Sequence, residues 1–246
     1  MVEQTSDTFF NGRMVVHQMR NGYRFSIDAV LLAATVVPKP GERLLDLGTG
    51  CGIIPLIIAF RYPTVHISAV EVQDQLADLA HANFRANHLQ ERIRLIRGDL
   101  RRLRPPADEA PFDWVMCNPP YRPPGSGRTN PNSQKALARH EILVDIAQVI
   151  STAKRMLRSG GRFAAIFPAV RTVDLLHRMR LARIEPKWLQ TVHSREGEPA
   201  RLILVHGINA ARPGIEWGAP LVIYDEKGDY TPVVARMFES TAESLK

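Results

Sequence analysis

Polar side chains suited to holding a small molecule follow four predicted strands of this 246-residue chain, each where the strand ends. The first strand runs into an aspartate and a glycine turn, the second and third into an acid, and the fourth into an asparagine. These residues are Asp46, Gly48, Gly50, Glu71, Asp99 and Asn118. Three carboxylates and a glycine turn at successive strand ends form a far more specific pattern than any one of them, and the pattern indicates a single ligand site.

The glycine turn reads DLGTGCG, with Gly48, Gly50 and Gly52 at alternate positions. Glycine adopts positive φ at no steric cost and lets a ligand approach the backbone N–H groups at a helix start. The G-x-G-x-G spacing differs from the G-x-G-x-x-G of dinucleotide sites. Asp46 would repel a pyrophosphate but attract a cationic ligand. A tight turn with a purely structural role is the alternative.

The two later carboxylates suit the polar parts of a nucleoside. Glu71 lies 23 residues beyond Gly48, where a carboxylate can accept hydrogen bonds from both hydroxyls of a ribose. Asp99 follows Gly98 and can accept one from the exocyclic amine of adenine. Taken singly, each has a plainer interpretation: Glu71 as a solvated acid, and Asp99 as the cap of a turn or helix.

These residues must be positioned by alternating strands and helices. We predict strands at 43–48, 65–72, 93–99, 112–118 and 162–167, with helices at 53–62, 74–89, about 140–158 and 172–182. Two more strands, 186–194 and 200–208, follow without a helix between them. This order predicts an α/β fold with a mainly parallel sheet, helices on both faces and an antiparallel hairpin at one edge. Ligands bind such sheets at the carboxyl ends of the strands.

The remaining segments are less regular. A helix over 26–36 could be capped by Ser26 or Asp28, and a hairpin is expected around Asn21-Gly22. Gly160-Gly161 are expected to end the helix that starts near residue 140. The tail carries one more strand at 220–225 and a terminal helix from about Pro232.

The segment LLDLGTGCGIIPL, Glu71 and the pair Gly98-Asp99 together resemble the cofactor site of class I S-adenosylmethionine-dependent methyltransferases. The resemblance covers about residues 25 to 208. It implies a Rossmann-like, seven-stranded fold with S-adenosylmethionine as cofactor. It further implies that Asp46, Gly48 and Gly50 lie near the methionine part, Glu71 near the ribose and Asp99 near the adenine.

The fourth strand end, Asn118-Pro119-Pro120-Tyr121, resembles the motif of methyltransferases that act on planar amino nitrogens. Such a nitrogen has a delocalised lone pair. The Asn118 side-chain oxygen and the Pro119 carbonyl could hold its two N–H groups in the geometry of the transition state. Tyr121 could stack on the flat substrate. A polar turn that merely ends the strand is the alternative.

The target is indicated by further resemblance. Only 42 residues precede Arg43, too few for the helical N-terminal domain of release-factor glutamine methyltransferases. The segments GYRFSIDAVLLA, CNPPY and ARHE resemble bacterial methyltransferases of adenine N6 at position 37 of a valine tRNA. The family then implies that Phe25, Ser26 and Asp28 touch the cofactor, although a simple covering helix would also explain them. We expect an N-terminal extension, 1–25, and a catalytic domain, 26–246.

Three rival functions stay open: a protein glutamine N5-methyltransferase, an rRNA base methyltransferase, and a non-catalytic RNA-binding module. Positive charge favours an RNA partner, since the net charge is +7 and the sequence pI is about 9.8. Residues 92–104 hold six arginines and one aspartate, and 114–140 hold no acid. These arginines could track tRNA phosphates.

The composition also sets expectations about surroundings. No apolar run reaches the roughly 18 residues that span a bilayer, and the N-terminus lacks the pattern of a secretory signal. Cys51 and Cys117 have no metal-ligand spacing and are expected to be buried thiols in a reducing cytoplasm. We therefore expect a cytoplasmic enzyme without metal or membrane partner. The sequence gives no oligomeric state.

Overall fold

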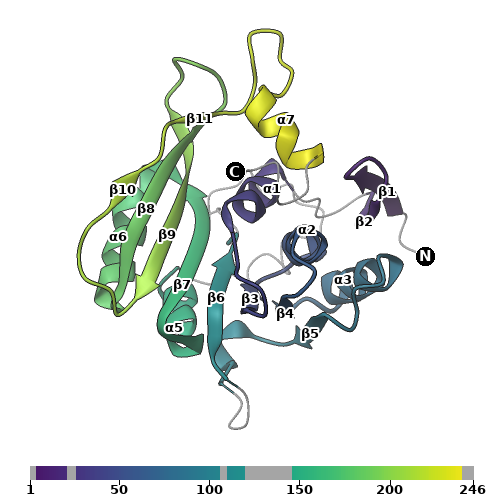
Figure 1. The fold of residues 1–246 in the computed structure, drawn as a ribbon, viewed down its shortest axis with the longest axis horizontal. Coiled ribbons are helices and arrows are strands. Elements are labelled where there is room, and N and C mark those ends of the chain that lie inside the picture. Colours follow the sequence, from purple (N-terminus) through teal and green to yellow (C-terminus); the bar gives the residue numbers. More distant parts are fainter. Residues whose placement is uncertain (1–3, 21–25, 106–109, 120–145, 240–246) are drawn as a thin grey trace, which may run out of the picture.

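One nine-stranded sheet forms the centre of the molecule. The computed structural model describes residues 4–20, 26–105, 110–119 and 146–239. The strands of the sheet follow the order β10-β8-β9-β7-β6-β3-β4-β5, and β11 also pairs with β8 (Figure 1). They are β3 (Arg43–Leu47), β4 (His66–Glu71), β5 (Ile93–Arg97), β6 (Phe112–Cys117), β7 (Leu157–Pro168), β8 (Ile184–His193), β9 (Ala200–Asn209), β10 (Glu216–Trp217) and β11 (Leu221–Val222).

The middle of the sheet is parallel, as the strand–helix alternation predicts. β3 pairs with β4 on one side and β6 on the other, β5 joins β4, and β7 joins β6. β9 runs antiparallel between β7 and β8, which is the predicted edge hairpin. The seven expected strands are thus confirmed. The short β10 and β11 extend the sheet to nine, and the strand expected at 220–225 is reduced to Leu221–Val222.

Helices cover both faces of the sheet (Figure 1). They are α1 (Ile27–Thr35), α2 (Ile53–Arg61), α3 (Asp74–Ala86), α5 (Ile146–Met156), α6 (Thr172–Leu181) and α7 (Pro232–Glu239), with 3₁₀ turns η1 (Leu100–Arg102) and η2 (Ala169–Arg171). The first three and α7 share one buried cluster, and α5 and α6 share the other. In β3, Leu44 faces the first cluster and Leu45 the second. A strand buried on both faces is apolar without alternation, as is typical of parallel sheets.

The expected end of helix α5 at Gly160-Gly161 is wrong. The helix ends at Met156, and β7 begins directly at Leu157, which pairs with Phe112 of β6. Both glycines lie inside β7. A Cβ on Gly161 would come within 3.1 Å of the Phe112 carbonyl oxygen, so the glycine permits close passage of the two strands.

An N-terminal hairpin packs on this core, although not where it was expected. It consists of β1 (Gln4–Phe9) and β2 (Met14–Met19), with left-handed residues Phe10 and Asn11 in its turn. Asn21-Gly22, the predicted turn, lie outside the described residues. The observed turn contains an Asn-Gly pair of its own, Asn11-Gly12, both with positive φ. Phe10 before this pair is fully buried and stacks on Phe60 of α2, with ring centroids 4.4 Å apart.

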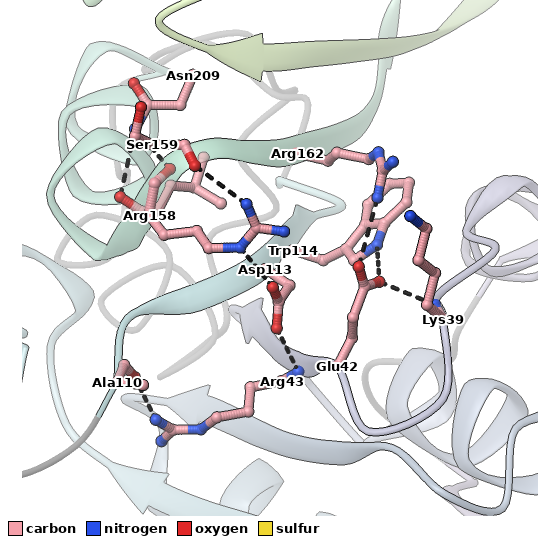
Figure 2. A network of polar contacts seen from close by, with 11 residues as sticks. Lys39, Glu42, Arg43, Ala110, Asp113, Trp114, Arg158, Ser159, Arg162 and Asn209 are labelled. Atoms are coloured by element: carbon pink, nitrogen blue, oxygen red, sulfur yellow. Dashed lines mark hydrogen bonds and ion pairs between the residues drawn. The ribbon is translucent and has the colours of Figure 1, made fainter.

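A polar network holds the amino ends of β3, β6 and β7 together (Figure 2). Buried Glu42 accepts a hydrogen bond from Trp114 Nε1 at 3.0 Å. Asp113 accepts one from the backbone N–H of Arg43 at 2.8 Å and another from Arg158 Nε at 2.5 Å. These bonds fix the strands at one edge of the sheet, and the register then aligns their carboxyl ends at the other.

Candidate active site

The four strand ends singled out in the sequence meet at one edge of the sheet. Leu47 lies opposite Val70 of β4 and Cys117 of β6, while Glu71 lies opposite Arg97 of β5. The chain proceeds from β3 outward to β4 and β5, then returns to place β6 on the other side of β3. Strand order therefore reverses between β3 and β6, which is where open α/β sheets form a ligand crevice.

The glycine turn leads from β3 into α2 with a left-handed backbone. Gly48, Gly50 and Gly52 have φ of 76°, 59° and 85°. A Cβ on Gly48 would meet nothing within 4 Å, so the turn is open to an approaching molecule there. A Cβ on Gly52 would lie 2.5 Å from a ring atom of Phe84, so this glycine serves helix packing instead.

Asp46 is the most unusual residue of the site. Its side chain is fully buried, and within the described ranges neither carboxylate oxygen has a hydrogen-bond partner; the same is true of the Thr49 hydroxyl. Burial raises the pKa of Asp46 to about 7; the nearby Thr49 hydroxyl lowers that pKa in part, and the charge of Glu71 adds to the rise. Buried carboxylates are normally paired, so this one is suited to a cationic ligand group.

Glu71 is satisfied by the backbone around it. Its Oε2 accepts the N–H of Gly50 at 2.8 Å, and its Oε1 accepts those of Val72 and Gln73, each at 3.0 Å. The carboxylate thus joins the glycine turn to the N-terminus of α3, where negative charge is favoured. A carboxylate has about four acceptor positions, so three N–H groups leave little of the capacity that two ribose hydroxyls would need.

Asp99 follows the end of β5 and makes a local ion pair. It caps η1 by accepting the backbone N–H of Arg101 at 2.9 Å, and its Oδ2 lies 2.5 Å from the Arg101 guanidinium. The Arg101 side chain is the main cause of a lowered Asp99 pKa. The alternative interpretation of Asp99 as a cap therefore applies. Hydrogen bonding to adenine would need one carboxylate oxygen to turn from Arg101.

The substrate-side residues are described only in part. Asn118 is half-buried at the end of β6, and Pro119 beside it is buried. Tyr121 and Phe25 lie outside the described residues. Ser26 is exposed at the start of α1, and its side chain makes no capping hydrogen bond.

Asp28 lies in the first turn of α1. The positions of Ser26 and Asp28 at the start of α1 are thus known, but they do not by themselves identify either residue as part of a ligand site.

One residue that holds the site was missed in the sequence. Asn83 of α3 is fully buried and donates to the Cys51 carbonyl oxygen at 2.9 Å, which fixes the glycine turn. Its side chain also exchanges hydrogen bonds with the backbone N–H and C=O of His17 on β2, at 2.7 and 3.0 Å. An amide among the apolar, inward-facing positions of a helix, next to Phe84, was the signal that could have revealed it.

Both cysteines are buried, and burial raises the pKa of Cys51 to about 12 and that of Cys117 well above its usual value. Neither thiol suits nucleophilic chemistry. In the described ranges, no three His, Cys, Asp or Glu side chains gather as metal ligands do. None of the helices described there has the length and apolar character that crossing a bilayer requires.

The arrangement combines three chemical capabilities at one edge. A buried carboxylate without a partner can neutralise a cation, an open glycine turn can receive a ligand close to the backbone, and an amide with an adjacent carbonyl can hold an amine. The Asp46, Gly48 and Asn118 positions lie on adjacent strand ends, so both reactants can be held in one crevice.

Comparison with known proteins gives a consistent result. The family model described as methyltransferase small domain matches residues 24–172. A tRNA1(Val) (adenine(37)-N6)-methyltransferase of a Flavobacteriaceae bacterium is 32% identical over 191 residues, covering 72% of this chain and 79% of that protein. One of the same name from Porphyromonas gingivalis is 29% identical, covering 95% and 94%.

Solved structures share the fold. A predicted O-methyltransferase from Agrobacterium tumefaciens has a TM-score of 0.69 at 24% identity, covering 87% of this chain and 97% of that one. Geranyl diphosphate C-methyltransferase from Streptomyces coelicolor, in a complex with S-adenosyl-L-homocysteine, has a TM-score of 0.54 at 15% identity, covering 74% and 79%.

Proposed function

Since the chain belongs to the methyltransferase small domain family, we propose that it transfers the methyl group of S-adenosylmethionine to an adenine N6 nitrogen of tRNA, at position 37 of the anticodon loop. The observation that carries the proposal is the buried carboxylate of Asp46, which has no hydrogen-bond partner among the described residues and lies one strand away from Asn118. A cation that binds the Asp46 carboxylate would lie next to Asn118, whose side chain can hold an amine.

The residues present fit S-adenosylmethionine. This cofactor is cationic at sulfur and at its amino group, and it has no pyrophosphate. Asp46 and Thr49 offer buried oxygens that have no partner in the described ranges, and the turn at Gly48 is open. We propose that these residues hold the methionine part, while Glu71 and Asp99 face the ribose and adenine. When bound, the cofactor supplies an electrophilic methyl group.

The protein's own residues then prepare the nucleophile. The Asn118 side-chain oxygen and the Pro119 carbonyl accept the two N–H groups of the target amine, which favours the tetrahedral nitrogen of the transition state over the planar ground state. Pro119 contributes a stiff backbone without a competing N–H. Tyr121 is proposed as the stacking wall for a base taken out of the loop. Asn118, an amide, takes no proton, and we propose that the product's proton is lost to solvent.

The choice of tRNA adenine rests on the relatives. Those named for adenine 37 of a valine tRNA include two from Porphyromonas gingivalis that match along 95% of this chain. We further propose that the partner is tRNA, that the enzyme acts in the cytoplasm, and that residues 1–25 form an extension to a catalytic domain over 26–246. The described hairpin of that extension contributes Phe9 and Met14 to the core of the domain.

The proposal is tested with methyl-labelled S-adenosylmethionine. The full chain is incubated with unmodified valine tRNA and, separately, with release factor, and labelled nucleosides are identified after digestion. Label in N6-methyladenosine of tRNA is the expected result. Label on protein glutamine would overturn the substrate, and label in neither with measurable cofactor binding would overturn the activity.

A variant localises the chemistry. Asn118→Ala is expected to lower the rate of transfer by at least about 100-fold. The change removes the side-chain oxygen whose hydrogen bond to the target amine is strongest in the transition state. Cofactor affinity by calorimetry should stay within about two-fold of the parent value. Full transfer activity in this variant would contradict the role of Asn118.

A further inference from the structure

The N-terminal hairpin is bound to α3 by two asparagine side chains, one helical turn apart (Figure 1). Asn83 Oδ1 accepts the backbone N–H of His17 at 2.7 Å, and its Nδ2 donates to the His17 carbonyl oxygen at 3.0 Å. Asn87, at the end of the helix, binds Val15 in the same way, at 2.9 and 2.6 Å. Residues two apart in a strand direct their backbone groups to the same edge. The two amides therefore take the place of a neighbouring strand beside β2.

Each amide has one more N–H, and its direction distinguishes the two asparagines. Asn87 donates it to the backbone carbonyl oxygen of Asn83, in the helix, at 2.8 Å. Asn83 donates it to the carbonyl oxygen of Cys51 in the glycine turn, at 2.9 Å. An amide group is planar, so its second N–H has a fixed direction once the His17 backbone holds the oxygen and the first N–H. The hairpin thus orients the hydrogen bond that reaches the turn.

The peptide group between Cys51 and Gly52 is held from both sides. Its carbonyl accepts the hydrogen bond from Asn83, and its N–H donates to the Thr49 carbonyl oxygen at 2.9 Å. A turn with three glycines at alternate positions could otherwise rotate its peptide groups at little cost, because glycine adopts positive and negative φ about equally readily. The bond from Asn83 therefore reduces the number of conformations open to the turn.

The same turn carries groups that are proposed to hold the cofactor. Thr49 follows Gly48, where a Cβ would meet nothing within 4 Å. The Thr49 hydroxyl lowers the pKa of Asp46, so these two side chains lie close together. Because the Thr49 carbonyl is bonded to the peptide that Asn83 holds, a shift of that peptide would displace the Thr49 hydroxyl from Asp46.

The hairpin is itself packed into the core, so it can serve as a fixed support. Met14 and Val16 are fully buried in the cluster that also contains side chains of α1, α2 and α3. Phe10 stacks on Phe60 of α2, and its N–H donates to the Phe238 carbonyl oxygen of α7 at 3.1 Å. The helix α2 begins at the glycine turn, and α3 covers that turn. The hairpin therefore contacts both helices that shape it.

We propose that Asn83 is a positioning residue for the cofactor, and that docking of the N-terminal hairpin and binding of S-adenosylmethionine favour each other through it. This inference rests on the proposed function, because it takes S-adenosylmethionine as the ligand of the glycine turn. Such coupling is reciprocal. If the docked hairpin increases the affinity for the cofactor, the bound cofactor stabilises the docked hairpin by the same factor.

The variants Asn83→Ala and Asn87→Ala form a matched pair for the test. Each removes an asparagine side chain from the same side of α3, and with it both hydrogen bonds to one residue of β2. Asn83→Ala also removes the hydrogen bond to the glycine turn, whereas Asn87→Ala leaves that bond in place. Circular dichroism and urea denaturation of the full chain verify that each variant folds.

Affinity for S-adenosylmethionine is measured by calorimetry at a temperature where both variants are folded. We expect Asn83→Ala to weaken binding about ten-fold, which is within the usual range of coupling between two sites. Asn87→Ala should weaken binding by at most about two-fold, because the turn keeps its bond. A residue that only stabilises the fold would not separate the two variants in this way, so equal affinities would overturn the proposal.

Hydrogen exchange in the parent chain gives a second measurement that needs no variant. Strand amides at the periphery exchange by local opening, which reports the docking of the hairpin. Saturating S-adenosylmethionine should slow exchange of the Val15 and His17 N–H groups about ten-fold more than exchange of the amides in α6, on the other face of the sheet. Equal slowing in β2 and α6 would mean that the cofactor stabilises the fold as a whole, and it would overturn the coupling even if Asn83→Ala did not fold.

Failure of this inference differs from failure of the proposed function. If the parent binds S-adenosylmethionine and methylates tRNA adenine, but β2 responds no more than α6, the coupling is overturned and the function stands. If calorimetry detects no binding of S-adenosylmethionine to the parent, the proposed function is overturned and this inference with it.

Discussion

Two buried carboxylates at the same edge of the sheet have opposite surroundings, and that difference assigns their roles. Glu71 accepts three backbone N–H groups, whereas Asp46 accepts none from the part of the chain that the structure describes. Burial destabilises the charged form of Asp46. We therefore propose that Asp46 is the residue that meets the cation, whereas Glu71 also joins the glycine turn to α3.

Cofactor binding should consequently depend on pH through Asp46. With a pKa of about 7, much of the carboxyl group carries a proton at neutral pH and must lose it to meet a cation. We expect the affinity for S-adenosylmethionine to fall about ten-fold from pH 8 to pH 6. Calorimetry in buffers of different ionisation enthalpy should detect the released proton. In Asp46→Asn, affinity should be weak at all pH values, and a pH dependence equal to the parent's would contradict the assignment.

At the scale of elements, α3 is the part that connects the others. Through Asn83 it bonds both the hairpin strand β2 and the glycine turn, and through Phe84 it packs against Gly52. The turn thus keeps its shape because a helix covers it from one side. The opposite side, at Gly48, is open, since a Cβ there would meet nothing within 4 Å.

This division of roles among the glycines can be measured. Gly52→Ala would force a Cβ to within 2.5 Å of Phe84 at a φ of 85°, so we expect a loss of at least about 2 kcal/mol in the free energy of unfolding and weaker cofactor binding. Gly41→Ala is the matched control, with a φ of 77° and nothing within 4 Å, and should cost about 1 kcal/mol. Equal losses in urea denaturation would refute the packing role of α3.

At the scale of the whole molecule, two distant groups should have opposing effects on stability. Burial raises the pKa of Asp46 from 3.8 to about 7, so its stabilising contribution is lost as the pH rises through 7. His206 packs against Trp114 and Trp188, and burial, together with the charge of Arg162, lowers its pKa from 6.5 to about 4. Its contribution is lost as the pH falls through 4. Between about pH 4 and 6.5, the two groups change the free energy of unfolding in opposite directions as the pH rises, and these changes cancel.

Single variants should reveal each slope in the ligand-free protein. Between pH 4.5 and 6, the unfolding free energy of Asp46→Asn should rise by about 2 kcal/mol relative to the parent's change, and that of His206→Gln should fall by a similar amount. Urea denaturation at the two pH values measures both. Variants that follow the parent's pH dependence would show that these groups do not titrate as their surroundings require.

The sequence by itself determined the order of strands and helices, because apolar periodicity and glycine punctuation are local. It also gave the edge of the sheet at which Asp46, Glu71, Asp99 and Asn118 meet, since parallel strands align their carboxyl ends. Tertiary structure decided what sequence could not show. Among the described residues the fold leaves Asp46 without a hydrogen bond. It brings the N–H of Gly50 to Glu71, whose other two donors, Val72 and Gln73, follow it in the chain. The pleat of β5 turns Arg97 to one face and Arg94 to the other, so one run of arginines becomes separate surfaces.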